Sequence, residues 1–398
     1  MARQLQEAYV VAATRAAVGK APRGVYRTTR PDTLLAHVLQ RVLAQVPALD
    51  AARVDDVIVG CAMPEYEQGM NVARIGVLLA GLPKSVPGMT INRFCSSGLN
   101  AVSIAADRIR TGEADVMIAA GTESMSMIPM LGRLALNAEV FTRDENVGIA
   151  YGMGLTAEKV AAQWNVSREA QDAFALASHQ KALAAQSAGE FDAEMSPLTV
   201  DERAPDLAAA TVRTRSRAVT RDEGPRPDTS AEGLARLRPV FAAKGTVTAG
   251  NSSQTSDGAG ASILVSERVL KAHNLAPLAR WAGFAVAGVP PEIMGVGPIA
   301  AIPKVLATTG LRQVQMDWIE LNEAFAAQSL AVIHDLRLDP AKVNPLGGAI
   351  ALGHPLGATG AIRTATIVHG LRRRKQKYGM VTMCVGTGMG AAGIFESM

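Results

Sequence analysis

Apolar positions along the chain switch between strict alternation, typical of strands, and a period of about 3.6 residues, typical of helices. Near the N-terminus this pattern predicts, in order, a strand in DDVIVG, a helix in NVARIGVLLAGL, a strand in GMTIN, a helix in LNAVSIAADRIRTG and a strand in ADVMIAAGTE. Near the C-terminus it predicts a strand in MDWIELNEAF, a helix in AAQSLAVIHDL, a turn and a helix around His354, and a strand in YGMVTM. Aligning MIAAGTE with TMCVGTG places Ala119 opposite Cys384.

This internal repeat predicts an α/β fold of two similar halves related by a pseudo-twofold axis. Each half is expected to contain a largely parallel sheet covered by helices. Turns at the carboxyl ends of strands are where such sheets bind ligands, so corresponding turns of the two halves are expected to meet at their interface. We place the N-terminal half at residues 1–121, with a return over 246–275, and the C-terminal half at residues 276–398.

Residues 122–245 interrupt the repeat and are expected to form an inserted cap. Two helices are predicted in GLTAEKVAAQW and SREAQDAFALASHQKALAAQ, with Ser167 as the N-cap of the second. In the predicted strand TVRTRSRAV, alternation places Arg213, Arg215 and Arg217 on one face. This face is either a solvated edge guarded by charge or a basic surface for a phosphorylated ligand. Further arginines follow it: Arg221, Arg226, Arg236 and Arg238.

Composition narrows the class of protein. The chain has 398 residues, of which 48% are hydrophobic, and its 40 basic and 36 acidic residues give a net charge of +4. The densest basic run, LRRRKQK, ends a predicted helix, where cations suit the dipole, so no nucleic-acid partner is expected. No segment is apolar enough for a membrane span or a signal peptide, and the terminal FESM lacks a peroxisomal tripeptide. Three distant cysteines indicate a reducing compartment, and we expect a cytoplasmic enzyme.

The candidate chemistry lies in three glycine-rich apolar runs, which contain Cys95, His354 and Cys384. A cysteine is a strong nucleophile only as thiolate, and the predicted strand, turn and helix around Cys95 place its sulfur at a helix N-terminus, where an anion is favoured. Each cysteine taken alone could equally be a small buried apolar residue, which is the interpretation given to Cys61. Together, two thiols and an imidazole on such turns indicate covalent acyl transfer. No ligand spacing such as CxxC occurs, so no metal is expected.

Eight segments together resemble the thiolase family over essentially the whole chain. These are NRFCSSGLNAV, AGTESMS, MGLTAEKVA, EGLARLRPVF, TAGNSSQTSDGA, LNEAFAAQ, NPLGGAIALGHPLGATGA and MCVGTGMGAA. GNSSQTSDGA and MGLTAE are more similar to degradative 3-ketoacyl-CoA thiolases than to biosynthetic members, which commonly have a histidine where this chain has Gly152. The resemblance implies the thiolase fold, with α-β-α-β-α layers and an inserted cap domain that contacts CoA.

The resemblance also implies roles for five catalytic residues. Cys95 matches the acylated nucleophile, and His354 matches the base that activates it and then faces the thioester oxygen. Cys384 matches the acid and base that exchanges a proton with the substrate α-carbon. Asn322 matches the residue that holds a water in one oxyanion site with His354, and Gly386 matches the backbone donor that pairs with the Cys95 N–H in the other.

Four further matches concern binding: Ser253 to the pantetheine, Arg226 near the CoA nucleotide, and Phe325 and Met294 as pocket walls. The implied activity is ping-pong thiolytic cleavage of 3-ketoacyl-CoA by CoA, which yields acetyl-CoA and a shortened acyl-CoA in fatty-acid β-oxidation. CoA and acyl-CoA are then substrates, and no cofactor is permanently bound.

Alternatives are an acetyl-CoA C-acetyltransferase, a β-ketoacyl synthase and a non-catalytic lipid carrier. Cys384 argues against a synthase, which typically has no second cysteine, and the retained Cys95, His354 and Cys384 argue against a carrier. We expect a homodimer or homotetramer; other β-oxidation enzymes are candidate partners, and the sequence does not decide whether they associate with it. The sequence does not specify the preferred acyl chain length, which depends on the shape of the loops around four methionines: Met125, Met127, Met130 and Met294.

Overall fold

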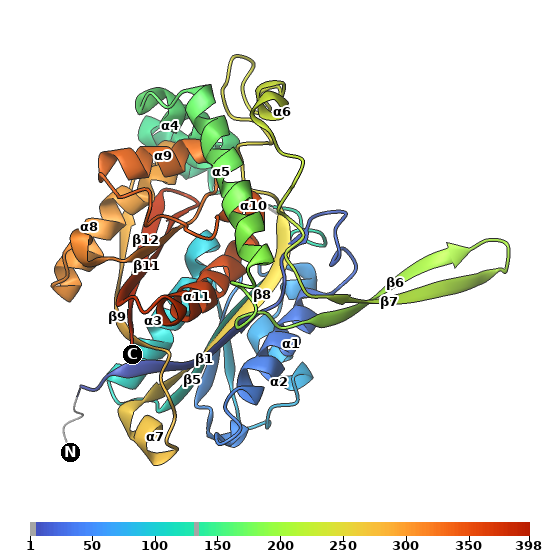
Figure 1. Ribbon diagram of the computed structural model, residues 1–398, viewed down its shortest axis with the longest axis vertical. Coiled ribbons are helices and arrows are strands. Elements are labelled where there is room, and N and C mark those ends of the chain that lie inside the picture. Colours follow the sequence, from blue (N-terminus) through green and yellow to red (C-terminus); the bar gives the residue numbers. More distant parts are fainter. Residues whose placement is uncertain (1–4, 131–134) are drawn as a thin grey trace.

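The computed structural model describes residues 5–130 and 135–398, and within them ten strands form one mixed sheet (Figure 1). The strand order is β10-β11-β12-β9-β1-β8-β5-β3-β4, with β2 beside β8. These strands are β1 (Ala8–Arg15), β2 (Gly19–Lys20), β3 (Asp56–Gly60), β4 (Gly88–Ile91), β5 (Val116–Ser124), β8 (Ser256–Ser266), β9 (Ala279–Gly288), β10 (Trp318–Leu321), β11 (Tyr378–Val385) and β12 (Met389–Ser397). The two half-sheets join where β1 pairs with β9 through Tyr9 and Val10.

The prediction of two largely parallel sheets is wrong. β3 pairs in parallel with β4 and β5, and β10 with β11, whereas the other neighbouring strands are antiparallel. β12 returns directly after β11 as a hairpin, and β8 returns beside β5 after the cap. Most of these strands are buried along nearly their whole length, so their sequences are continuous apolar runs whichever way a neighbour points.

The repeat is visible in the order of elements. The first half runs β1, α1, β3, α2, β4, α3, β5 and β8, and the second runs β9, α8, β10, α9, α11, β11 and β12. The counterpart of β4 is a single parallel bridge between Ile319 and Val343. The helices of the two halves are α1 (Pro31–Ala44), α2 (Val72–Leu79), α3 (Ser97–Arg110), α7 (Glu267–Ala272), α8 (Gly297–Thr309), α9 (Ala326–Asp335), α10 (Ala349–Leu352) and α11 (Leu356–Arg373). The division into domains at residues 121, 245 and 275 stays a prediction.

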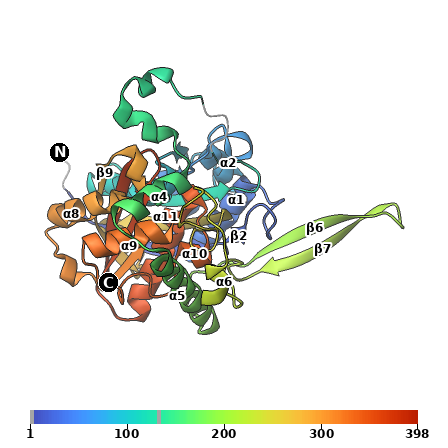
Figure 2. The same cartoon turned by 90° about the horizontal axis from the view of Figure 1, so that it is seen from above.

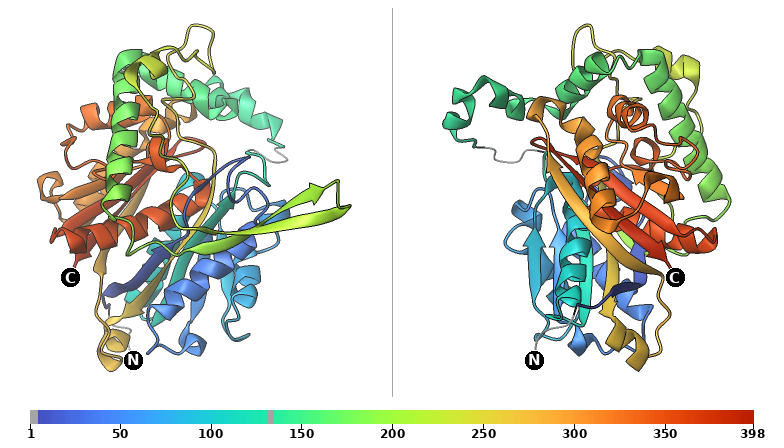
Figure 3. Two further views of the ribbon diagram at one scale, coloured as in Figure 1. Left: turned by 45° about the vertical axis from the view of Figure 1, so that its right-hand side comes forward. Right: turned by 90° about the vertical axis from the view of Figure 1, so that its left-hand side faces the viewer.

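Helices α3 and α11 lie between the two half-sheets and cross in close contact. A Cβ at Gly98 would lie 2.6 Å from the Ala361 nitrogen, and one at Gly360 would lie 2.1 Å from the Leu99 nitrogen, so glycine permits this approach. α1 and α2 cover the outer face of the N-terminal half, and α8 and α9 cover that of the C-terminal half (Figure 3). Separate apolar clusters fill the centre and both outer faces. The expected α-β-α-β-α layering is confirmed.

The segment between β5 and β8 forms the cap. It contains α4 (Met153–Gln163), α5 (Arg168–Ser187), α6 (Ala231–Ala235) and a hairpin of β6 (Leu198–Asp206) and β7 (Thr211–Val219). Ser167 caps α5 as predicted, because its Oγ accepts a hydrogen bond of 3.2 Å from the Ala170 N–H. The hairpin projects away from the body (Figures 1 and 2). Within the described ranges, the structure contains no helix with the length and apolar character that a bilayer span requires.

Candidate active site

Cys95 lies in a short 3-10 turn, Phe94–Ser96, between β4 and α3. Two side chains shape this turn: Asn92 Oδ1 accepts from the Phe94 N–H at 2.8 Å, and Ser97 Oγ accepts from the Arg93 N–H at 2.8 Å. Phe94 has a positive φ of 42°, which reverses the chain sharply enough to bring Cys95 to the N-terminus of α3. The predicted strand, turn and helix around Cys95 are therefore present.

The Cys95 sulfur is almost fully buried, and burial decides its protonation. Burial raises the pKa of the Cys95 thiol to about 12, although the backbone N–H groups of Gly386 and of Cys95 itself lower it and the charge of Glu123 raises it further. The helix end alone does not produce a thiolate, so the expectation of a favoured anion fails in the resting protein. Cys95 therefore needs a base when it attacks.

His354 supplies a neutral imidazole from the loop between α10 and α11. Burial, followed by the charge of Arg363, lowers the pKa of His354 to about 3. The amide of Asn322 donates to Nε2 at 3.2 Å, so Nδ1 carries the proton and donates it to Thr359 Oγ1 at 2.6 Å. Thr359 was missed in the sequence, although its position in the first turn of the helix after His354 is a usable signal. The ring is held on both sides and is neutral at pH 7.

Asn322 follows the last residue of β10, and its backbone N–H donates to Thr382 of β11 at 2.9 Å. Its side chain is buried, and Oδ1 has no hydrogen-bond partner among the described residues. A buried carbonyl oxygen without a partner costs free energy, and it can accept a hydrogen bond from a water or a ligand beside His354.

Cys384 is fully buried near the end of β11. It belongs to a small apolar cluster with Met294, Phe325 and residues of α4. Its Sγ donates to Gln328 Oε1 at 3.9 Å, and burial, with the nearby Cys95 as the second cause, raises the pKa of the Cys384 thiol. Gln328 was also missed, although it lies in the motif LNEAFAAQ.

Gly386 begins the turn between β11 and β12. Its N–H faces the Cys95 sulfur, and a Cβ on Gly386 would lie 3.4 Å from the Phe94 ring. The β11 turn of the second half thus lies against the Cys95 turn of the first half. Of the predicted catalytic residues, Cys95, Cys384 and Gly386 meet here, and Asn322 meets His354.

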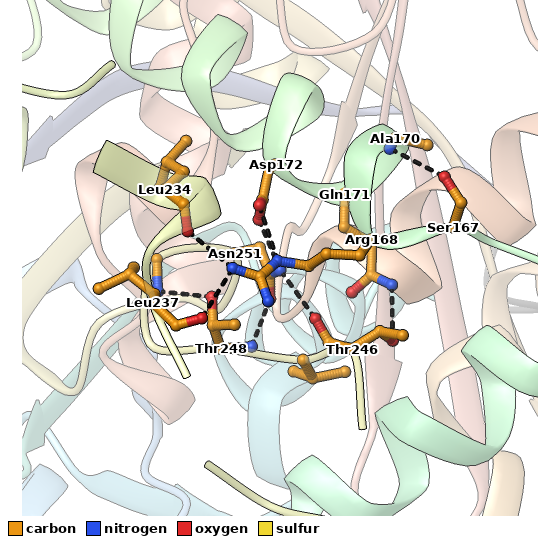
Figure 4. Close-up of polar contacts among 12 residues, drawn as sticks. Ser167, Arg168, Ala170, Gln171, Asp172, Leu234, Leu237, Thr246, Thr248 and Asn251 are labelled. Atoms are coloured by element: carbon orange, nitrogen blue, oxygen red, sulfur yellow. Dashed lines mark hydrogen bonds and ion pairs between the residues drawn. The ribbon is translucent and has the colours of Figure 1, made fainter. Parts of the chain in front are cut away.

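Helix α5 of the cap holds the turn that contains Asn251 (Figure 4). Arg168 pairs with Asp172 at 2.7 Å and donates to the carbonyl groups of Leu234 and Leu237. Asp172 accepts from Asn251 Nδ2 at 2.9 Å, two residues before Ser253. The Ser253 N–H then donates to the Ala324 carbonyl at 2.9 Å, which ties this turn to the NEAF segment beside Cys384.

Arg226 lies in a cavity of about 410 Å³ with Lys20, His179 and Ser252 among its lining residues. Ser253 itself is not among them. Phe325 packs edge-to-face on Phe241 at 6.0 Å between ring centroids.

Two predicted groups lie elsewhere. Arg213, Arg215 and Arg217 lie on the exposed hairpin and do not line the Arg226 cavity, which favours the interpretation of this face as a solvated strand. Met125 and Met127 pack against the central apolar cluster, and Met130 is exposed, so they do not share the Cys384 cluster with Met294.

No group of three or more His, Cys, Asp or Glu side chains among residues 5–130 and 135–398 has the arrangement of a metal site. The structure brings two buried thiols together beside the Gly386 N–H, and it holds a neutral imidazole between Asn322 and Thr359. This set can form and break a thioester while moving one proton at a carbon atom.

Comparisons with known proteins cover almost the whole chain. The family model "Thiolase, N-terminal domain" matches residues 8–268, and "Thiolase, C-terminal domain" matches residues 275–397. The 3-ketoacyl-CoA thiolase of Bacillus subtilis (strain 168) is 48% identical over 394 residues, which are 98% of this chain and 100% of that protein. The acetyl-CoA acetyltransferase of Bacillus anthracis has a TM-score of 0.89 at 38% identity and 100% coverage of both chains. The dimeric peroxisomal thiolase of Saccharomyces cerevisiae has a TM-score of 0.88 at 42% identity, covering 99% of this chain and 98% of that chain.

Proposed function

The chain belongs to the thiolase family, and on that basis we propose that it is a 3-ketoacyl-CoA thiolase, an acetyl-CoA C-acyltransferase. It cleaves 3-ketoacyl-CoA with CoA and releases acetyl-CoA and an acyl-CoA shortened by two carbons. The observation that carries the proposal is the meeting of Cys95 from one half with the Gly386 N–H from the other, close to the second thiol Cys384.

In the first half-reaction, Cys95 Sγ attacks the 3-keto carbon of the substrate while His354, neutral at rest, takes the thiol proton. The bond between carbons 2 and 3 breaks, and its electron pair leaves as the enolate of acetyl-CoA. Protonated His354 and a water held by Asn322 Oδ1 stabilise the enolate oxygen. Cys384 gives its proton to carbon 2, which completes acetyl-CoA and leaves Cys384 as thiolate.

In the second half-reaction, the Cys384 thiolate takes the proton of an incoming CoA thiol. The CoA thiolate attacks the carbonyl carbon of acyl-Cys95, and the oxyanion accepts hydrogen bonds from the backbone N–H groups of Cys95 and Gly386. The bond to Cys95 Sγ breaks, and Cys95 recovers the proton held by His354. Both cysteines and the histidine return to their starting states, so the cycle is ping-pong.

CoA is proposed to lie between the cap and the body. Arg226 in its cavity contacts the nucleotide, Ser253 contacts the pantetheine, and Phe325 and Met294 form walls of the pocket next to Cys384. The cap, proposed as residues 122–245, would thus bind CoA, and the halves at 1–121 with 246–275 and at 276–398 would provide the reacting groups.

The assembly is proposed to be a homodimer, with a homotetramer as the alternative. Strand β4 is an edge of the sheet; it contains the exposed Met89, and the exposed Met70 lines the same surface pocket. An unpaired apolar edge favours pairing with another chain. Light scattering on the purified protein distinguishes monomer, dimer and tetramer. We further propose a cytoplasmic enzyme of fatty-acid β-oxidation that associates with other enzymes of that pathway.

The proposal is tested with a series of 3-ketoacyl-CoA substrates of rising chain length in the presence of CoA. Cleavage along the series is expected, because this chain has Gly152 where biosynthetic members of the family commonly have a histidine. Cleavage of acetoacetyl-CoA alone would instead identify an acetyl-CoA C-acetyltransferase, the activity named for the Bacillus anthracis relative. If no substrate of the series is cleaved, the remaining interpretation is a non-catalytic lipid carrier. Peptide mapping after acylation should find the acyl group on Cys95, and finding it on Cys384 would reverse their roles.

A further inference from the structure

Glu123, near the end of β5, is a buried carboxylate that the mechanism above does not use. Its Oε2 accepts hydrogen bonds from the Ala62 N–H at 2.7 Å and from the Gly357 N–H at 2.8 Å. Its Oε1 accepts from the Met63 N–H at 3.3 Å and, in a short contact, from Gln68 Nε2. One carboxylate therefore joins a loop of the N-terminal half to the start of α11 in the C-terminal half.

Both joined segments lead directly to the catalytic turns. Gly357 lies in the first turn of α11, three residues after His354. On the other side, β3 ends at Gly60, where a Cβ would lie 2.3 Å from the Gly98 nitrogen in the first turn of α3. That turn begins two residues after Cys95. The contacts thus form a continuous path from the Cys95 turn through Glu123 to the His354 turn.

From this path we propose that Glu123 is a positioning residue that sets the distance between the Cys95 turn and the His354 turn. The inference rests on the proposed function, because it assigns Glu123 to the same reaction. A carboxylate fits this place because it accepts several hydrogen bonds at once and lies at the N-terminus of α11, where the helix dipole favours a negative charge.

The hydrogen bonds of Glu123 are proposed to hold Cys95 in place, whereas its negative charge makes the Cys95 thiol harder to ionise. Burial is the main cause of the raised pKa of the Cys95 thiol, and the charge of Glu123 raises that pKa further and so disfavours the thiolate. Removal of the charge should therefore make Cys95 easier to ionise, while loss of the hydrogen bonds should disturb the alignment that turnover needs. Substitution of a residue that acts only in folding would not lower turnover and at the same time make Cys95 easier to ionise.

The test uses Glu123→Gln, which keeps the size of the side chain but offers one acceptor oxygen in place of two. We expect kcat to fall about 100-fold, the effect of a displacement on the order of 1 Å in an active site, with little change in KM for CoA. Alkylation of Cys95 by iodoacetamide at pH 8, followed by peptide mapping, should become faster by at least about threefold. Glu123→Asp keeps the charge but is too short to span both N–H groups, so turnover should fall without faster alkylation.

Glu194→Gln is the matched control, because Glu194 is an equally buried carboxylate that binds Arg15 and Thr366 away from the two turns. It should lower the melting temperature and leave kcat and Cys95 alkylation unchanged. The inference is overturned if Glu123→Gln retains turnover within about threefold of the wild type, or if Glu194→Gln loses as much. If the Gln variant does not fold, a normal kcat of the Asp variant overturns it instead. A wild-type protein without thiolase turnover refutes the proposed function, whereas unchanged variants refute only the role of Glu123.

Discussion

Substitution of Gly360 by alanine tests whether the crossing of α3 and α11 holds the catalytic turns in place. The new Cβ would lie 2.1 Å from the Leu99 nitrogen and 2.8 Å from the Leu99 Cβ. The two helices must therefore separate by about 1.3 Å, the difference between 2.1 Å and the 3.4 Å at which ordinary contact begins. Because the nearest atom is a backbone nitrogen and the next is a Cβ, which the backbone fixes, no side-chain rotation relieves the contact. Overpacking of this kind destabilises a protein by about 1–3 kcal/mol, and we expect the upper end of this range.

The same displacement should also reduce activity. Cys95 lies just before α3 and His354 just before α11, so a separation of the helices moves the two groups apart. A shift on the order of 1 Å costs about 100-fold in rate. The measurements are the thermal midpoint and kcat for 3-ketoacyl-CoA cleavage of the folded variant.

Gly288→Ala is the control, because its Cβ would meet only one heavy atom, at 4.0 Å. It should change neither the midpoint nor kcat appreciably. A Gly360→Ala protein with the midpoint and kcat of Gly288→Ala would refute the reasoning, since the crossing would then tolerate a methyl group.

Three further predictions address the site and the cap. Cys384→Ala should slow the exchange of acetyl-CoA α-protons with deuterated solvent by about 10²–10⁴-fold, while acylation of Cys95 survives better; near-normal exchange would make His354 the acid and base at carbon. Arg226→Ala should weaken CoA more than a pantetheine thioester without the nucleotide, and less so at high salt, whereas equal losses would remove Arg226 from the nucleotide site. Burial, followed by the charge of Arg226, lowers the pKa of His179 to about 4, so the folded state resists a proton that the unfolded chain binds below about pH 6.5. Stability should therefore fall as the pH drops from 6.5 towards 4, and His179→Gln should remove on the order of 1–2 kcal/mol of the loss between pH 7 and pH 5; an unchanged acid sensitivity on thermal melting would contradict this.

The sequence predicted what local patterns control. The turn before α3 depends on residues within a few positions of Cys95, so the strand, turn and helix were visible without a structure. The ionisation of Cys95 was not, because the sequence shows the helix end but not the burial that outweighs it. Thr359 and Gln328 were missed because their meaning comes from the atoms they contact. Strand direction could not be predicted either, because a buried strand has the same apolar run beside a parallel or an antiparallel neighbour.

The arginine strand illustrates a second limit. Alternation correctly placed Arg213, Arg215 and Arg217 on one face of a strand, and the structure contains that strand as β7. Nothing in the alternation specified that the hairpin would project away from the body (Figure 2) or that its arginines would not line the Arg226 cavity. The direction of a projecting hairpin depends on its anchoring at Leu198 and Val219, which pack on the outer apolar cluster of the N-terminal half.

The way the cap leaves and rejoins the sheet has a consequence for how such an enzyme can diversify. The cap departs at the end of β5 and returns at the start of β8, where Ser124 and Asp257 are paired neighbours. Asp257 closes this junction by accepting hydrogen bonds from Ser124 Oγ and from the N–H and Oγ of Ser126. Because the two ends of the cap meet at this hydrogen-bonded junction, doubling the inserted length adds only about 0.6 kcal/mol to the free-energy cost of closing the loop. Insertions and exchanges within the cap can therefore alter which thioester is admitted, while the sheet and its paired turns keep the same bond-making chemistry.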